Sequence, residues 1–138
     1  MSRHTVDDLQ AIADAIVAMA EPGEQIEANV ARSRETDIRV YNGELEHFVS
    51  AQSQGISVRV IKDGRTGSSH AGTLDETAWR EVLAEARENA TLGGVDEWAG
   101  LAEPDGVPIV EQELWDDTLD AFDTAKRLRL QKNLSVLL

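Results

Sequence analysis

Apolar residues along the first ninety positions follow two different periods, and the change of period marks the predicted elements. From Thr5 to Glu21 they recur every three or four residues, which predicts an amphipathic helix. Thr5 can cap its first turn, and Pro22-Gly23 directly follows its last turn. The expected buried stripe consists of Val6, Leu9, Ile12, Ala13, Ile16, Val17 and Ala20.

Between Gln25 and Ala71 the period is two, which indicates strands with one apolar face. Asn42-Gly43 and Asp63-Gly64 interrupt the alternation, and both are dipeptides that type I′ hairpin turns prefer. Gly55 interrupts it as well and predicts the end of a strand. The pattern therefore predicts an antiparallel meander of about five strands, at 25–33, 37–41, 44–54, 56–62 and 65–71.

A second helix follows the strands. Thr73 and Glu76 have the spacing of a capping box, in which the threonine accepts from the amide three residues on and the glutamate reaches back. The helix is expected to run to about Ala90 and to end at Gly93-Gly94. Its buried stripe would be formed by Trp79, Val82, Leu83, Ala86 and Ala90.

The remaining residues change in composition twice. The stretch 95–117 is acidic and contains Pro104, Asp105-Gly106 and Pro108, which is typical of a linker. From Thr118 a third helix is predicted through Leu119, Phe122 and Ala125. The expected α+β organisation is thus a domain at 1–94 with its sheet covered by the capped helix, a linker at 95–117 and a helical tail at 118–138.

Charge is concentrated in one region of the chain. The formal net charge is −13, and residues 75–123 hold 15 acidic side chains against two basic ones. Residues 124–138 hold four basic side chains and no acidic one. A phosphate backbone would be repelled, so the composition argues against nucleic-acid binding. The acidic block is either a solubilising surface or a docking face for a basic partner.

Length and composition indicate a globular protein. At 138 residues the chain has the length of one domain. It contains no apolar run long enough to span a membrane, and Met1-Ser2-Arg3-His4 lacks the apolar core of a signal peptide. The absence of cysteine excludes disulfides and a cysteine nucleophile. We therefore expect a cytoplasmic protein without membrane association.

The three histidines, His4, His47 and His70, do not form a metal motif, because none has a second histidine at helical spacing. His4 belongs to the terminus, and His47 is expected to be partly buried beside other strand residues. Ser69 and His70 are neighbours on a strand and would face opposite sides, while Ser68 lies about 7 Å from His70 by strand rise. The sequence therefore predicts no catalytic, cofactor-binding or metal-binding residue and no cofactor.

Two tryptophans lie in the acidic stretch. Trp98 and Trp115 would either pack their loop against its own domain or serve as anchors for a partner protein. The first interpretation is the commoner outcome for tryptophans in loops, and the sequence leaves both open.

Four segments in a fixed order resemble the N-terminal domain of the TldD/PmbA family, which is described as modulators of DNA gyrase and as components of zinc-dependent peptidases. These segments are 36–46, 55–61, 63–67 and 73–75. The linker from Asp105 to Asp116, with Leu114-Trp115-Asp116, is more similar to the PmbA (TldE) branch than to the TldD branch.

The resemblance implies a role in proteolysis. In that family the TldD-type subunit carries a His-Glu-x-x-x-His metal motif and a cysteine beyond this region, and a PmbA-type partner completes a chamber for peptides. None of those positions exists here, so the chain alone is expected to be non-catalytic. It would assemble as a homo- or hetero-oligomer with a TldD-type subunit, and peptide would bind only in the full assembly.

The tail raises a further expectation. Family members are about three times as long, which suggests a truncated or frameshifted chain. The apolar tail residues from Leu128 to Leu138 would either pack on the sheet or drive self-association, and we expect self-association. The alternative function is that of a free-standing adaptor whose acidic surface binds a basic partner.

Overall fold

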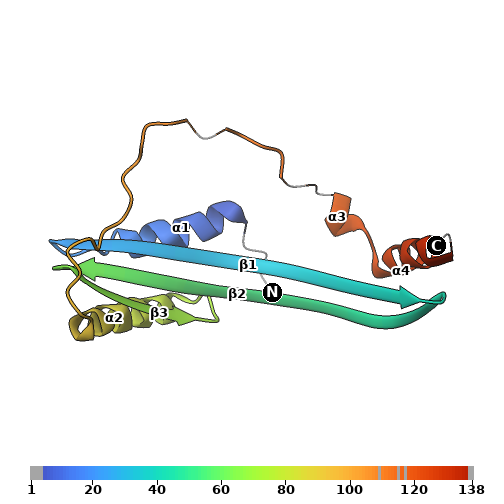
Figure 1. The fold of residues 1–138 in the computed structure, drawn as a ribbon, viewed down its shortest axis with the longest axis horizontal. Helices are drawn as coiled ribbons and strands as arrows, with labels where there is room; N and C mark the ends of the chain where they lie inside the picture. The colour runs from blue at the N-terminus through green and yellow to red at the C-terminus, as the bar shows by residue number, and fades with distance from the viewer. Residues whose placement is uncertain (1–4, 109, 115, 117, 137–138) are drawn as a thin grey trace. The chain divides into compact units, whose positions relative to one another are not determined.

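The computed structural model describes residues 5–108, 110–114, 116 and 118–136. Its elements, in chain order, are four helices and three strands of an α+β fold (Figure 1). They are α1 (Val6–Val17), β1 (Glu24–Tyr41), β2 (Glu44–Lys62), β3 (Arg65–Ala71), α2 (Glu76–Leu92), α3 (Thr118–Ala121) and α4 (Thr124–Val136). Within the described ranges, β1, β2 and β3 form a single sheet in that order.

Both predicted hairpin turns are confirmed. Asn42 and Gly43 have φ angles of 49° and 76°, and Asp63 and Gly64 have 52° and 70°. Two successive positive φ angles define a type I′ turn, whose twist matches that of the flanking strands. The second turn sets the antiparallel register of β2 and β3, in which Lys62 lies opposite Arg65 and each step outward adds one pair.

The prediction of five strands is wrong, because neither expected break occurs. Residues 34–36 continue β1, since the backbone pairing with β2 does not depend on an apolar face. Gly55 lies inside β2. A Cβ there would lie 2.9 Å from the carbonyl oxygen of Ala71, so the glycine provides room for the end of β3. The sheet therefore has three strands, two of them long.

The chain divides into two compact units. The core unit comprises residues up to Ser33 and Ser53–Glu103, and the hairpin–tail unit comprises Arg34–Gln52 and the residues from Pro104 onward. Among the described residues, every buried hydrophobic side chain lies in the core unit.

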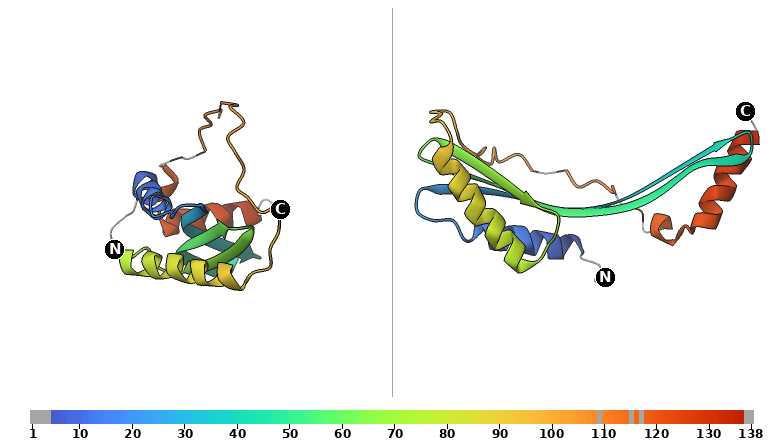
Figure 2. Two further views of the ribbon diagram at one scale, coloured as in Figure 1. Left: turned by 90° about the vertical axis from the view of Figure 1, so that its left-hand side faces the viewer. Right: turned by 90° about the horizontal axis from the view of Figure 1, so that it is seen from below.

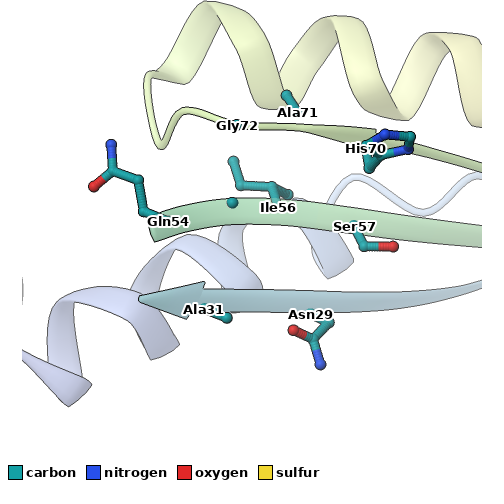
Figure 3. Close-up of a pocket in the computed structure, with 9 residues that line it drawn as sticks. Asn29, Ala31, Gln54, Ile56, Ser57, His70, Ala71 and Gly72 are labelled. Carbon is teal, nitrogen blue, oxygen red and sulfur yellow. The ribbon is translucent and has the colours of Figure 1, made fainter. Parts of the chain in front are cut away.

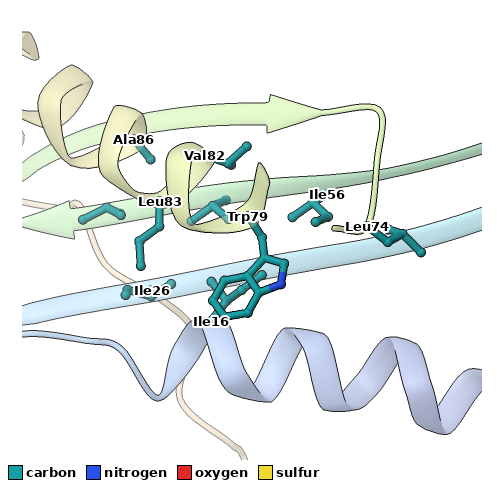
Figure 4. Close-up of a cluster of buried hydrophobic side chains, with 10 residues drawn as sticks. Ile16, Ile26, Ile56, Leu74, Trp79, Val82, Leu83 and Ala86 are labelled. Carbon is teal, nitrogen blue, oxygen red and sulfur yellow. The ribbon is translucent and has the colours of Figure 1, made fainter. Parts of the chain in front are cut away.

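In the core unit, α1 and α2 lie on the same side of the sheet (Figure 2). Alternate residues of β1 and β2 face them, and Trp79 of α2 lies beside Ile16 of α1 (Figure 4). The predicted stripe of α2 is buried throughout, which confirms it. The stripe predicted for the first helix is wrong in part, because only Ile16 of it is buried while Val6 and Val17 are exposed. The cluster consists of Ile16, Ile26, Ile56, Val58, Val60, Leu74, Trp79, Val82, Leu83 and Ala86.

Helix α2 lies very close to the sheet at Gly67 of β3. A Cβ built on this residue would lie 2.1 Å from the nitrogen of Ala90 and 2.2 Å from the carbonyl oxygen of Ala86. Real Cβ atoms do not approach backbone atoms this closely. The absence of a side chain at Gly67 therefore allows α2 to lie directly on β3.

The ends of α1 and α2 differ from the predictions in two places. The first helix stops at Val17 and not at Glu21, because Met19 and Ala20 donate to carbonyls three residues back and tighten the last turn. The N-cap of α2 is Asp75, so the capping box predicted at Thr73 is wrong. The Thr73 hydroxyl donates instead to the Asp75 carboxylate at 2.6 Å.

The predicted third helix is divided in two. It begins at Thr118 as expected, but α3 ends at Ala121 and α4 begins at Thr124. The carboxylate of Asp123 accepts from the amide of Lys126 at 2.7 Å, which is the geometry of an N-cap. Asp123 therefore starts a new helix where the pattern of apolar residues predicted a continuous one.

Candidate protein-interaction surface

Neither His47 nor His70 belongs to a metal site among the described residues. His47 of β2 is exposed, so the expectation that it is partly buried is wrong. His70 of β3 is also exposed, and His4 lies outside the described residues. In the described part of the chain, no group of three or more His, Cys, Asp or Glu side chains is placed to hold a metal ion.

The serines beside His70 do not form a nucleophile–base pair with it. Ser69 is buried against α2, where its hydroxyl donates to the Glu85 carboxylate at 2.6 Å. Its neighbour His70 lies on the opposite, open face of the sheet, as strand geometry predicted. Ser69 thus joins β3 to α2.

A different serine lies opposite His70. Ser57 of β2 is its register partner, and Asn29 of β1 lies in the same row across the sheet (Figure 3). These side chains line an open hollow of about 330 Å³ together with residues 54–56 and 70–72. No carboxylate is among its lining residues, so the pair lacks an acidic group to orient the imidazole. The hollow offers hydrogen bonds to a polar ligand.

Sequence reasoning missed the Ser57–His70 pair, although a signal for it was present. A two-residue turn at Asp63-Gly64 places Lys62 opposite Arg65, and counting outward from that pair brings Ser57 opposite His70. Ser69 is adjacent to His70 in sequence, but the side chains of adjacent strand residues point to opposite faces of the sheet.

One partly buried ion pair joins the ends of several elements in the core unit. The Arg87 guanidinium donates to Glu24 at 2.8 and 3.0 Å and to the Met19 carbonyl at 2.8 Å. The Glu24 side chain is only 2% exposed. The hydrogen bond from Arg87 lowers the pKa of Glu24 below its usual value, and the same bond raises the pKa of Arg87. This pair fixes the end of α1 and the start of β1 against α2.

The part of the hairpin between Arg34 and Gln52 has a different character. Every residue of β2 from Glu44 to Ser53 is exposed. Large apolar side chains are among them, and they lie on both faces because Leu45 and Val49 alternate with Phe48. A two-stranded hairpin alone is marginally stable in water, and exposed apolar patches of this kind mark interaction sites. We identify residues 34–52 as the candidate interaction surface and call them the apolar hairpin.

A second exposed apolar group lies in the core unit, on the segment from Leu92 to Leu101. Trp98 is 86% exposed, so it does not pack against its own domain. Trp115 lies outside the described residues. Of the two interpretations given for these tryptophans, exposure favours the partner anchor for Trp98.

No helix among the described residues has both the length and the apolar character needed to cross a membrane. The charged and exposed side chains of α2 and α4 illustrate why.

Comparison with solved structures finds proteins that share this fold. Two solved structures are similar: a proposed modulator of a DNA gyrase from Thermotoga maritima and TldE from Thermococcus kodakarensis. Their TM-scores are 0.67 and 0.57, at 21% and 23% sequence identity. The matches cover 89% and 77% of this chain, but only 27% and 23% of the solved chains. They show a shared fold, and this chain corresponds to about a quarter of each protein.

The family comparison is more specific than the structural one. A search of the curated proteins finds no significant match. The family model for the PmbA/TldA metallopeptidase domain 1 matches residues 26–90, which run from the start of β1 to the end of the buried stripe of α2. The resemblance read from the sequence is thereby confirmed: residues 26–90 of this chain match the first domain of the PmbA/TldA metallopeptidase family.

Proposed function

We propose that this chain is a non-catalytic assembly domain of a PmbA-type subunit, which pairs with a TldD-type zinc peptidase subunit and helps to enclose a peptide-processing chamber. The observation that carries the proposal is the apolar hairpin. It exposes Leu45, Phe48 and Val49, while the buried hydrophobic side chains among the described residues all lie in the core unit. Cover from a partner would remove this apolar surface from water.

The absence of chemistry in the sequence supports a non-catalytic role. The chain has no cysteine, and its three histidines are too far apart in sequence for a paired metal motif. The catalytic metal of such an assembly would be supplied by the other subunit. The domain would then contribute by positioning that subunit and by closing the space around the peptide.

Binding between this chain and a purified TldD-type subunit, measured by surface plasmon resonance, tests the proposal. Phe48→Ser and Leu45→Ser should each weaken binding at least about tenfold, since loss of a buried anchor costs about 1–2 kcal/mol or more. Val6→Ser is the matched control, because Val6 is an exposed apolar residue of α1 in the core unit.

Equal binding by the two hairpin variants and the control would contradict a docking role for the apolar hairpin. Failure of the unmodified chain to bind any TldD-type subunit would contradict the assembly role itself.

A further inference from the structure

The segment from Leu92 to Leu101, here named the Trp98 loop, is held firmly by hydrogen bonds. The amide of Asp96 donates to the Gly64 carbonyl at 2.7 Å, and the Arg65 guanidinium donates to the carbonyl of Gly93. At its far end, the amide of Leu101 donates to the Gln25 side chain at 3.0 Å. The loop is thus fixed at its start, near its middle and at its end.

The large apolar side chains of this loop nevertheless face water. Leu92 and Trp98 are 81% and 86% exposed, and Val95 is exposed as well. A tryptophan buries about 150–250 Å² when covered, and such residues dominate protein interfaces. A loop that is already ordered loses little conformational entropy on binding. The Trp98 loop therefore has the properties of a preformed anchor.

The charge around this anchor restricts its partner. No lysine, arginine or histidine occurs between Arg87 and Lys126. Acidic side chains lie within and beside the loop, at Asp96, Glu97 and Glu103. Opposite charges across an interface favour association, whereas like charges suppress it. The loop should bind a surface that is both apolar and basic.

Helix α4 of the same sequence presents such a surface. Lys126, Leu130 and Leu134 are spaced four residues apart, so they form one stripe on the helix, and all three are exposed. Arg129 is also exposed, and residues 124–138 contain no acidic side chain. Apolar contacts and positive charge therefore lie together on α4.

We propose that the Trp98 loop of one copy binds the exposed stripe of α4 of a second copy. Both surfaces carry exposed apolar side chains that a second copy would cover, Trp98 on the loop and Leu130 and Leu134 on α4. The contact would be head to tail, because it joins two different patches. It goes beyond the assembly proposed above and uses residues outside the apolar hairpin, so either proposal can fail alone.

Sedimentation velocity of the full chain and two double variants tests this contact. The loop variant is Glu97→Lys with Trp98→Ala, and the tail variant is Lys126→Glu with Arg129→Glu. The average mass of the sedimenting species should rise with concentration for the unmodified chain. It should rise less at high salt, because screening weakens the charge attraction. Each variant alone should remain monomeric, with circular dichroism confirming its fold.

An equimolar mixture of the two variants gives the sharpest result. One variant retains an intact tail and the other an intact loop, so a single contact can form and the mixture should stop at dimers. A matched control, Glu111→Lys with Leu114→Ala, changes an acidic and an exposed apolar residue elsewhere and should associate like the unmodified chain.

Three outcomes would overturn the proposal. The first is an unmodified chain that stays monomeric at about millimolar concentration. The second is association of both double variants as strong as that of the unmodified chain, which would place self-association on another surface such as the apolar hairpin. The third is a mixture that contains no dimer, since the intact loop and the intact tail would then have met without binding.

Discussion

Gly67→Ala tests how the core unit is held together. The added Cβ would lie 2.1 Å from the nitrogen of Ala90 and 2.2 Å from the carbonyl oxygen of Ala86. Both are backbone atoms of α2, so no rotation of a side chain can relieve the overlap. The helix must move away from β3 by more than 1 Å to reach an ordinary contact distance of 3.4 Å, and its buried stripe must move with it.

The cost of that movement can be estimated from the stripe. Three large side chains of α2, Trp79, Val82 and Leu83, are buried, and burial of each is worth about 1.5–3 kcal/mol. A gap of about 0.5–1 Å forfeits roughly a quarter to a half of a dispersion contact. We therefore expect a loss of about 3 kcal/mol of unfolding free energy. For a unit of this size, the melting temperature should fall by roughly 12–24 °C.

Thermal unfolding followed by circular dichroism measures this loss. Gly72→Ala is the matched control, because a Cβ there would meet no atom within 4 Å, and its melting temperature should stay close to that of the unmodified chain. Adding Ala86→Gly to Gly67→Ala should not restore stability, since it removes a side chain and leaves the backbone contact in place. A melting temperature for Gly67→Ala equal to that of the control would refute the close packing of α2 on β3.

Three further predictions concern the two turns, the Glu24–Arg87 ion pair, and zinc binding with peptide cleavage. Gly43→Val should cost about 1 kcal/mol of unfolding free energy through backbone strain alone. Gly64→Val should cost more, because its Cβ would also lie 2.9 Å from the carbonyl oxygen of Asp96. Equal decreases in melting temperature for the two variants would contradict this. The fold lowers the pKa of Glu24 below its usual value of 4.5. The stability that its ionised carboxylate contributes is therefore fully present above the usual value and is lost as the pH falls through the lowered pKa. Arg87→Met should remove about 2 kcal/mol of unfolding free energy at pH 7, because it removes hydrogen bonds to a charged group. It should also flatten the acid side of the pH dependence of urea unfolding, and an unchanged pH profile would show that this ion pair does not cause that dependence. The isolated chain should bind no stoichiometric zinc and cleave no casein, and one tightly bound zinc per chain by metal analysis would disprove this.

The sequence by itself determined most of the local structure. The 3.6-residue period of α2 identified its whole buried stripe, and Asn42-Gly43 and Asp63-Gly64 identified both turns with their positive φ angles. These features depend on residues close together in the chain, so local chemistry is sufficient to predict them. The order of such segments was also enough to recognise the family.

Only the tertiary structure decided where the strands end and which surfaces remain exposed. Gly55 reads as a break in the sequence, yet it lies within β2 because the end of β3 passes beside it. Trp98 reads as a residue that packs on its own domain, yet the main chain of its loop is fixed while its ring faces water. Whether an apolar side chain is buried depends on what lies across from it, and that neighbour is distant in sequence. The period of a pattern shows which residues share a face, but only the packing shows whether that face is covered.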